Sequence, residues 1–480
     1  MSKIKKLLLI APPSDVIYGT YKALYRKGFL NPPIHLCYVA ASAEAAGHKA
    51  TILDGDAERL TISDIIQTIK QCSPHLIGIT STSIDFWVAA EIIIQIKTIF
   101  PYIPVILGGI HINIFGIKVL EKHYAIDFGC VGDGEHLIVE LLDKLEDGIP
   151  AYSSIKGLIY RDGDQVIQNP YREINRNLDC YPFPSRHLLK NELYYRSVPY
   201  RGYQQTTAVM SSRGCPFRCV YCAVEKITGG KQVRIRSAQN VLEELTFIVK
   251  KLHIQHVAFN DDCLTLDKSR IVELCEGILQ RNLQFTWEGL SRADLVDSHI
   301  LKKMKQAGLV RISYGIESGN PNILKTLRKE ETLDQITEAF RITKEAGIVT
   351  RGSIILGVPY ENRKTIKQTL DFVNHLKGLD QLVVNVLQPY PGTKVREMIL
   401  NGEGGACYLG DTDSFYSLQR FGSSSVSVND LSPRDLVFFQ KWGFLSFYFR
   451  PKIFLNNLRI SGYKAFIQDG IGFMRSILGI

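Results

Sequence analysis

Three cysteines stand close together near the middle of this 480-residue chain. They are Cys215, Cys219 and Cys222, and their spacing is C-x3-C-x2-C. Three thiolates at this spacing can each bind one iron of a [4Fe-4S] cluster and leave the fourth iron open to chelate a further ligand. The alternative is a zinc site, but structural zinc takes four ligands, and no nearby histidine or cysteine supplies the fourth. We therefore predict a cluster with one open iron.

Polar and glycine-containing segments follow the triplet, each at the end of an apolar run. The acidic pair Asp261-Asp262 comes first, then Arg292, then Glu317-Ser318, and last the segment Gly352–Pro359. Each is weak evidence alone, because an acidic pair at a strand end is usually a turn or a helix cap, and a glycine in a strand often marks only close packing. Their common order after the cysteines makes them a joint signal.

The triplet and these later segments resemble the signature of the radical S-adenosylmethionine (SAM) superfamily, including an aromatic residue before the last cysteine. The resemblance implies that the cluster cleaves SAM reductively, which releases a 5′-deoxyadenosyl radical that abstracts hydrogen from carbon. It also implies a small-molecule substrate and a flavodoxin or ferredoxin as the electron donor. The residues that the resemblance assigns to SAM binding are Tyr221, Asp261, Asp262, Arg292, Glu317, Ser318, Gly352, Ile354 and Gly357.

Small and hydroxyl-bearing residues mark the ends of predicted strands in the first part of the chain. They lie in Gly78–Ser83, Ile106–His111 and Gly129–Glu135. Hydroxyl donors and paired glycines suit the close approach of a bulky planar ligand. These segments resemble the cobalamin-binding domain that precedes many radical SAM domains. The residues so assigned to cobalamin are Ser81, Thr82, Ser83, Gly108, Gly109, His111, Gly132 and Glu135.

One departure from that resemblance concerns the lower ligand of cobalt. Cobalamin domains that bind cobalt through histidine carry Asp-x-His-x-x-Gly after the first strand, whereas the loop here, Ala11-Pro-Pro-Ser-Asp-Val-Ile-Tyr-Gly19, has no histidine. The resemblance therefore implies a cobalt without a lower histidine. The alternative is a flavodoxin-like scaffold that has lost cobalamin. We interpret His111 as a pocket or structural residue rather than a cobalt ligand.

Two alternating patterns of apolar runs and helical segments must position these residues. The first predicts a doubly wound, Rossmann-like α/β domain, and the second predicts a partial (β/α)6 barrel with its chemistry at the carboxyl ends of the strands. The predicted strands are Leu7–Ile10, Ala50–Leu53, Leu76–Ile79 and Val105–Leu107, then Ala208–Ser211, His256–Phe259, Gln284–Trp287, Val310–Gly315, Thr350–Leu356 and Leu382–Leu387.

The chain is predicted to contain four regions. A hairpin that turns at Asp162-Gly163 marks the segment between the two α/β patterns. Beyond about Asn401 the strand and helix alternation ends, and an aromatic-rich helical tail follows. The regions are a cobalamin-binding-like domain at 1–150, a connector with the hairpin at 151–205, the partial barrel at 206–400 and the tail at 401–480.

The tail contains a dense aromatic run, Trp442–Leu455, with cations beside it. Trp and Tyr suit a membrane interface and nearby cations suit anionic headgroups, so peripheral membrane contact is one hypothesis. The other is a helix that packs on the barrel and closes its substrate mouth. The cations are Arg450, Lys452, Arg459 and Lys464.

The composition is that of an ordinary globular chain, with 45% hydrophobic and 22% charged residues and a formal net charge of +9. No apolar run reaches the roughly 18 residues that a membrane span needs, and Pro12-Pro13 break the apolar start, so we expect a cytoplasmic protein. Without a basic run that carries interleaved aromatics, we expect no nucleic-acid partner. The positive charge suits anionic partners such as a reduced flavodoxin. The remaining cysteines are predicted to be small buried hydrophobes: Cys37, Cys72, Cys130, Cys180, Cys263, Cys275 and Cys407.

These patterns identify the chain as a member of the cobalamin-binding radical SAM enzymes, which include the anaerobic cyclase of chlorophyll biosynthesis and cobalamin-dependent methyltransferases. The main hypothesis is methylation of an unactivated carbon in a hydrophobic or secondary-metabolite substrate, with lipid-like molecules among the candidates. The first alternative keeps both cofactors but catalyses oxidative cyclisation or rearrangement. The second is a redox binding protein that senses cobalamin or SAM.

Overall fold

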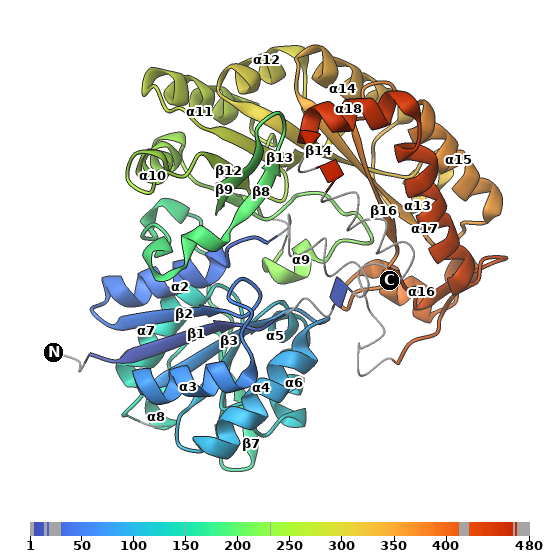
Figure 1. The fold of residues 1–480 in the computed structure, drawn as a ribbon. Helices are drawn as coiled ribbons and strands as arrows, with labels where there is room; N and C mark the ends of the chain where they lie inside the picture. The colour runs from blue at the N-terminus through green and yellow to red at the C-terminus, as the bar shows by residue number, and fades with distance from the viewer. Residues whose placement is uncertain are drawn as a thin grey trace. The chain divides into compact units, whose positions relative to one another are not determined.

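The computed structural model describes residues 4–13, 17–18, 30–147, 149–230, 232–411, 422–463 and 466–467. The chain forms two compact units, each with its own seven-stranded sheet (Figure 1). The first unit contains Met1–Val16, Asn31–Tyr194 and Lys226–Gly230, and the second contains Ile17–Leu30, Tyr195–Glu225 and Lys231–Ile480.

The sheet of the first unit has the strand order β2-β1-β3-β4-β5-β6-β7, and its first five strands are parallel. This 2-1-3-4-5 order is the flavodoxin-like doubly wound arrangement, which reverses direction between β1 and β3 and binds ligands at the strand ends there. All four predicted strands are confirmed. The parallel strands are β1 (Lys6–Ala11), β2 (Lys49–Asp54), β3 (Leu76–Ser81), β4 (Val105–Gly109) and β5 (Phe128–Cys130).

Helices cover both faces of this sheet, as a doubly wound fold requires. Helix α2 packs with α7 on one face, and α3 packs with α4 on the other (Figure 1). The core between the sheet and α3 and α4 consists of strand residues such as Ile77 and Leu107 and helix residues such as Ile65 and Ile92. The helices are α2 (Ile34–Ala45), α3 (Ile62–Cys72), α4 (Phe86–Ile99), α5 (Ile110–Phe115), α6 (Ile117–Lys122), α7 (Gly134–Lys144) and α8 (Ile149–Tyr152).

The predicted hairpin is present, and it extends the first sheet. It consists of β6 (Leu158–Asp162) and β7 (Gln165–Gln168), and β6 pairs antiparallel with β5. The pairing gives β5 a second neighbour and draws the following residues, as far as Tyr194, into the first unit. A strand pattern does not reveal its pairing partner, so residues 151–205 were predicted to form a separate connector.

The sheet of the second unit has the order β16-β15-β14-β13-β12-β9-β8. Six of its strands are parallel and β8 runs antiparallel to β9, which gives an open half-barrel that contains all six predicted strands. The strands are β8 (Tyr195–Val198), β9 (Gly202–Val209), β12 (His256–Phe259), β13 (Thr286–Ser291), β14 (Leu309–Glu317), β15 (Val349–Leu356) and β16 (Gln381–Val386).

Helices line the outer face of the half-barrel in an arc (Figure 1). As predicted, Ser237 caps the first of them, because its hydroxyl accepts a hydrogen bond from the Asn240 N–H at 3.1 Å. Two short antiparallel pairs, β10 (Ser212–Arg213) with β11 (Arg234–Ile235) and β17 (Ala406–Tyr408) with β18 (Val426–Val428), complete the strands. The helices are α9 (Val224–Ile227), α10 (Ala238–Lys250), α11 (Lys268–Gln280), α12 (Ser298–Gln306), α13 (Pro321–Thr326), α14 (Leu333–Glu345), α15 (Arg363–His375) and α16 (Lys394–Leu400).

The two faces of the half-barrel differ in chemistry, because side chains alternate along each strand. Trp287, Ile312 and Ile354 pack in the apolar core beneath the helices. On the opposite, inner face, near the start of the strands, the Glu288 carboxylate is paired with the guanidinium groups of Arg196 and Arg311. These two cations hold the pKa of Glu288 well below its usual range despite its burial.

Helix α17 (Pro433–Tyr448) covers the edge strand β16, and α18 (Pro451–Ser461) packs against α17. The Gln440 side-chain amide donates to the Val384 carbonyl at 2.9 Å, and the Tyr448 hydroxyl both donates to the Leu382 carbonyl and accepts from the Leu382 N–H at 3.0 Å. These bonds satisfy backbone groups that an open sheet edge would otherwise expose. No helix in the described part of the chain is long and apolar enough to span a membrane.

Candidate functional site

The three cysteines lie on the loop that follows β10, at the carboxyl end of the first parallel barrel strand. Cys215 and Cys219 are half-buried and Cys222 is exposed. Although the residue is exposed, the protein around the Cys222 thiol shields it from water and raises its pKa to about 11. The charges of Cys219 and Cys215 contribute to this shift, so the three thiols lie within electrostatic reach of one another. Such a loop fits a cluster that can be approached from solvent.

The distance between the possible ligands separates a site for one metal ion from a site for an iron–sulfur cluster. No three His, Cys, Asp or Glu side chains in the described ranges converge on one point as ligands of a single metal ion. A cubane does not require that convergence, because each thiolate binds a different iron. The donor set of three thiols on one loop therefore fits a [4Fe-4S] cluster.

The acidic pair at the end of β12 fixes the start of this loop. Asp261, which is only 3% exposed, accepts hydrogen bonds from the Ser211 N–H at 2.8 Å and from the Ser211 and Ser212 hydroxyls at 2.6 Å. The Asp262 carboxylate accepts from the Gly214 N–H at 3.0 Å. Both carboxylates thus position the backbone immediately before Cys215. Their predicted contacts with SAM stay predictions.

A buried polar chain connects the cluster loop to the end of β14. The Tyr221 hydroxyl donates to Glu317 Oε1 at 2.9 Å, and Lys329 Nζ lies 3.7 Å from the same oxygen and 3.2 Å from Glu331 Oε2. Glu317 sits at a β-bulge with φ of +61°, a left-handed conformation that is strained for a residue with a side chain and that recurs at functional sites. Gly315 makes room for it, because a Cβ at that position would meet Glu317 Oε1 at 2.0 Å.

Arg292 has a buried hydrogen-bond donor that no protein group satisfies. Its Nε and Nη2 donate to the two oxygens of Asp294 at 2.9 Å each, and its guanidinium lies 3.8 Å above the ring of Phe217 in the cluster loop. Its third nitrogen, Nη1, is buried and makes no hydrogen bond. A buried unpaired donor is costly unless a ligand completes it. An amino-acid carboxylate such as that of SAM fits this position.

Three other predicted SAM residues turn away from the inner face. The Ser318 hydroxyl is hydrogen-bonded to the Thr369 hydroxyl of α15 at 3.0 Å. A Cβ on Gly352 would meet Ile316, Leu379 and Phe340, and the Ile354 side chain packs in the helix-side core. Only the backbone of Gly352 and Ile354 remains available to a ligand. Gly357, with φ of +90°, donates its N–H to the buried Glu361 carboxylate at 2.6 Å.

The structure adds two residues to this site that the sequence analysis missed. Lys329 is 4% exposed and Glu331 is 5% exposed, and the Glu331 carboxylate accepts from the Ala293 N–H at 2.7 Å. In the sequence they belong to the run Arg328-Lys-Glu-Glu331, which is typical of a solvated turn. Positive φ at Arg328 and Glu330 turns Lys329 and Glu331 inward, a conformation that no sequence pattern here announces. Cys263 also proves to be buried close to Cys215.

In the first unit, the residues predicted to bind cobalamin gather at the carboxyl ends of β3 and β4. Ser81 is 3% exposed, and its hydroxyl has no hydrogen-bond partner. The Thr82 N–H donates to Asp85 Oδ1 at 2.6 Å, which holds the turn after β3. Ser83 Oγ lies 3.3 Å from His111 Nδ1, and the His111 ring stacks on Phe86 with centroids 3.9 Å apart.

His111 is therefore part of the packed wall of this region. Burial lowers the pKa of its imidazole to about 3, so the ring is neutral at physiological pH. The ring is held by its stacking on Phe86 and its contact with Ser83, and its role as a pocket or structural residue stays a prediction. Part of the loop Ala11–Gly19, where a lower histidine would be expected, lies outside the described residues.

Glycines keep the strand ends open to a large ligand. A Cβ at Gly108 or Gly132 would meet no atom within 4 Å, whereas one at Gly109 would meet the Ser81 carbonyl oxygen at 2.5 Å. Gly109 thus allows β3 and β4 to approach, and Gly108 and Gly132 leave free space beside them. Glu135 is buried in the first turn of α7. The unpaired Ser81 hydroxyl, on the strand next to the topological switch point, and the open glycines on the neighbouring strand ends fit a corrin.

Comparison with known proteins agrees with both sites. Residues 209–373 match the model of the Radical SAM superfamily, and residues 26–142 match the B12 binding domain. An uncharacterized methyltransferase of Pyrococcus horikoshii is 31% identical over 485 residues, which cover 100% of this chain and 98% of that protein. The anaerobic magnesium-protoporphyrin IX monomethyl ester cyclase of Rubrivivax gelatinosus is 27% identical over 70% of this chain and 61% of that protein.

Among solved structures, the radical SAM methyltransferase TsrM from Kitasatospora setae, with cobalamin and a [4Fe-4S] cluster bound, has the same fold. The TM-score is 0.69 with 18% sequence identity, and the match covers 86% of this chain and 78% of that chain. The half-barrel and its cysteine loop define a radical SAM enzyme. With its amino-terminal unit, the chain belongs to the family of radical SAM enzymes that carry a B12-binding domain.

This membership confirms the predicted fold class, the enzyme class and the cofactors, which are a [4Fe-4S] cluster, SAM and cobalamin. The roles of the individual residues stay predictions. Cys215, Cys219 and Cys222 would hold the cluster, Arg292 and Glu317 would face SAM, and the ends of β3 and β4 would face the corrin.

Proposed function

We propose that this enzyme transfers a methyl group to an unactivated carbon of a small-molecule substrate. The observation that carries the proposal is full-length similarity to an uncharacterized methyltransferase. Two candidate ligand sites support it: the cysteine loop with the unpaired Arg292 Nη1 in the second unit, and the ends of β3 and β4 in the first. When bound, the cluster and SAM supply hydrogen abstraction, and cobalamin supplies the methyl group.

The protein's own residues orient the cofactors and hold charge. The Arg292 guanidinium, already fixed by Asp294, offers its remaining donor to the SAM carboxylate. Lys329 balances the two buried carboxylates of Glu317 and Glu331, so that Tyr221 keeps its hydrogen bond to Glu317 and the cluster loop stays in register with the strand ends. Residues held in this way would orient SAM before any reaction begins.

A hydrophobic substrate is the class that we favour. On β13, the side chain of Leu290 follows Glu288 on the same face of the strand and is 44% exposed. An exposed leucine beside the residues predicted to hold SAM suits an apolar portion of a substrate. Lipid-like molecules and apolar secondary metabolites belong to this class.

Isotopic labelling tests the proposed reaction. Anaerobically reconstituted enzyme is incubated with cell extract and SAM that carries a CD3 methyl group, and the products are analysed by mass spectrometry. A product heavier by one CD3 group in place of hydrogen supports methyl transfer. An oxidised, unlabelled product would instead support the rival reaction, oxidative cyclisation or rearrangement, to which the similarity with the cyclase points. Failure to turn SAM over repeatedly would favour a sensor.

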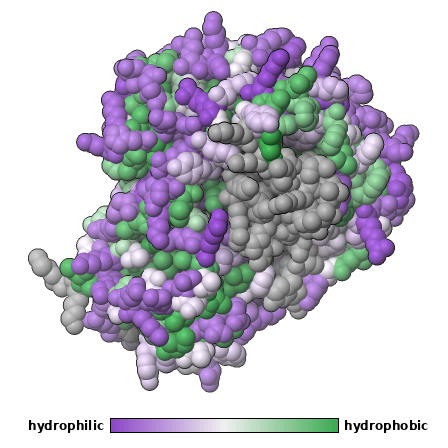
Figure 2. Space-filling model, viewed as in Figure 1, coloured by the Kyte–Doolittle hydropathy of each residue, from purple (hydrophilic) through white to green (hydrophobic). Residues whose placement is uncertain are grey.

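We also propose that the carboxyl-terminal helices meet a membrane surface. One side of α17 and α18 packs on the half-barrel, while Phe438, Trp442, Phe449, Phe454 and Leu455 are 45–63% exposed. Figure 2 shows apolar surface among polar residues in this region. Exposed aromatic side chains beside cations suit an anionic bilayer surface.

The structure indicates which cations should be replaced to test the membrane proposal. Arg450 stacks on Phe447 and donates to the Asn374 carbonyl, so its charge is engaged within the protein, whereas Lys452 and Arg459 are exposed. Lys464 lies outside the described residues. Lys452→Glu with Arg459→Glu should weaken sedimentation with anionic vesicles by about 1 kcal/mol per cation removed. If the wild-type protein does not sediment with such vesicles at low salt, the tail serves only to cover the barrel edge.

A further inference from the structure

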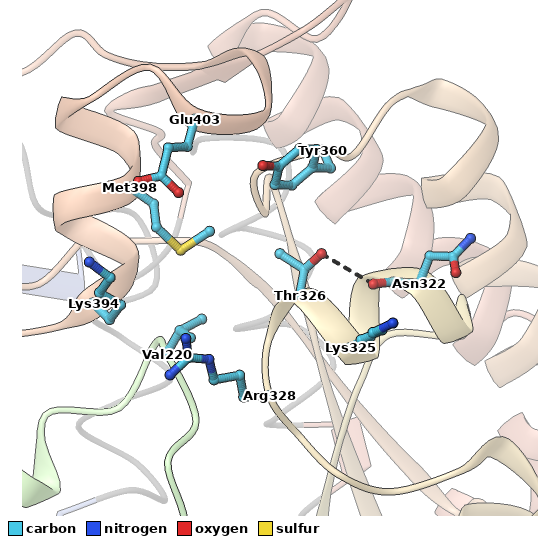
Figure 3. A pocket seen from close by; sticks show the side chains of 9 residues that line it. All are labelled: Val220, Asn322, Lys325, Thr326, Arg328, Tyr360, Lys394, Met398 and Glu403. Carbon is cyan, nitrogen blue, oxygen red and sulfur yellow. Dashed lines mark hydrogen bonds between the residues drawn. The ribbon is translucent and has the colours of Figure 1, made fainter.

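A pocket of about 370 Å³ lies on the second unit, beside Val220 of the cluster loop (Figure 3). Its walls come from α13 with the turn after it, from α16 and from the loop after β15. Its floor is Val220, which stands between Cys219 and Cys222 in the chain. The pocket is therefore the surface approach to the loop that would hold the cluster.

Two backbone hydrogen bonds fasten Val220 to the walls. The Val220 N–H donates to the Leu327 carbonyl at 3.1 Å, and the Val395 N–H donates to the Val220 carbonyl at 2.8 Å. The Val220 side chain is 3% exposed and packs with Leu327 and Val395 in an apolar cluster. Since successive Cα atoms are about 3.8 Å apart, the pocket floor lies within about 8 Å of the Cα atoms of both cysteines.

The rim of the pocket is cationic. Lys325 and Arg328 are exposed on the α13 side, and Lys394 is exposed on α16, where it pairs with Glu397 at 2.9 Å. Glu403 is the single carboxylate among the lining residues, so three cations face one anion. Figure 3 shows Lys394 and Lys325 on opposite sides of Val220 and Met398, with Arg328 beside Val220.

This distribution suits a protein surface better than a small anion. A phosphate or carboxylate site needs donors that converge on one point, and these side chains do not point to a common centre. Cations spread around an apolar patch are typical of transient interfaces in which charge guides the approach and fixes the orientation. The net charge of +9 adds attraction for an acidic partner.

We propose that this cationic pocket, with Lys325, Arg328 and Lys394 on its rim, is the docking surface for an acidic one-electron carrier of the flavodoxin or ferredoxin class. In the docked pair the carrier is oxidised by one electron, and that electron reduces the cluster by one through the Cys219–Cys222 segment. No proton or atom is transferred. The inference rests on the cluster, and it holds for methylation and for cyclisation alike.

The test compares two charge-reversed variants of the full-length, reconstituted enzyme. Lys325→Glu with Arg328→Glu changes the rim, and Lys302→Glu with Lys364→Glu makes the same change in charge at exposed positions on α12 and α15. The probe is a recombinant bacterial flavodoxin. Its oxidised form gives the Kd by titration, and its reduced form gives the rate of cluster bleaching by stopped-flow absorbance. Dithionite serves as a small reductant that needs no docking surface.

The rim variant should bind flavodoxin about tenfold or more weakly and accept its electron correspondingly slowly, with a rate that no longer falls as salt is added. Its reduction by dithionite should equal that of the wild type, and the control variant should behave as the wild type throughout. Unchanged flavodoxin affinity in the rim variant, or an equal loss in the control variant, would overturn the proposal. A parallel loss of dithionite reduction would also overturn it, because the effect would then lie in the cluster loop itself.

Discussion

Replacing Arg292 by glutamine should weaken SAM binding through the loss of a single interaction. The guanidinium is 5% exposed and uses two of its three nitrogens on Asp294, which leaves the buried Nη1 for the SAM carboxylate. A hydrogen bond to a charged group contributes about 1.5–3 kcal/mol. At about 1.4 kcal/mol per tenfold change in Kd, Arg292→Gln should raise the Kd for SAM roughly 10- to 100-fold.

The assay is equilibrium dialysis of radiolabelled SAM against anaerobically reconstituted protein, with iron content measured in parallel. Decarboxylated SAM is the matched ligand, because it lacks only the carboxylate, and Arg292→Gln should leave its affinity unchanged. Arg341→Gln on the exposed face of α14 is the matched variant, since Arg341 pairs only with neighbouring glutamates and should not affect either ligand. Equal losses for SAM and decarboxylated SAM, or no loss for SAM, would refute the role given to Nη1.

Three further predictions concern other parts of the structure. Gly108→Leu should reduce the corrin absorbance of purified protein while its iron content stays normal, because the side chain would enter the open space beside β4; retained corrin would contradict this site. His111 has a pKa of about 3 in the folded state, so below pH 6.5 only the unfolded state gains its proton, and stability should fall by about 2 kcal/mol at pH 5. His111→Phe should lose this pH dependence in thermal melts. Burial raises the pKa of Asp85 to about 6, but Asp85 is present in both proteins, so its effect cancels in the difference between them. Glu288→Gln leaves the buried Arg311 and the half-buried Arg196 without their carboxylate and should destabilise the second unit by about 3–5 kcal/mol. An unchanged urea midpoint, followed by the fluorescence of the adjacent buried Trp287, would refute this.

The strands were the most predictable part of the fold. Short apolar runs between turn residues identified all ten predicted strands, because both sheets are mainly parallel and covered, and such strands are apolar along most of their length. The same property hides which face a residue occupies. Ile354 packs under the helices, whereas its neighbour Ile355 packs with Val220 of the cluster loop. A continuous apolar run does not show which of two neighbouring residues faces the helices, because successive side chains point to opposite faces of the sheet.

The candidate site was predictable where chemistry is carried by residue type and spacing. The cysteine triplet was predicted in this way, whereas Arg292 and Glu317 were predicted from the family resemblance, and the structure brings all of them to one end of the half-barrel. Lys329 could not be found, because its burial depends on left-handed backbone at Arg328 and Glu330 that charged residues seldom adopt. Ser318 was assigned to SAM by the family resemblance, but its hydroxyl is hydrogen-bonded to Thr369, beyond the bulge in β14.

The ratio of products formed from SAM tests the central claim most directly. Reconstituted enzyme with its substrate is quenched over time, and 5′-deoxyadenosine, S-adenosylhomocysteine and methylated product are quantified. A cobalamin-dependent radical methyltransferase uses one SAM for hydrogen abstraction and another to remethylate cobalt, so the three should form in equal amounts, and Cys219→Ala should form none. Steady formation of 5′-deoxyadenosine and an altered substrate without S-adenosylhomocysteine would contradict methyl transfer.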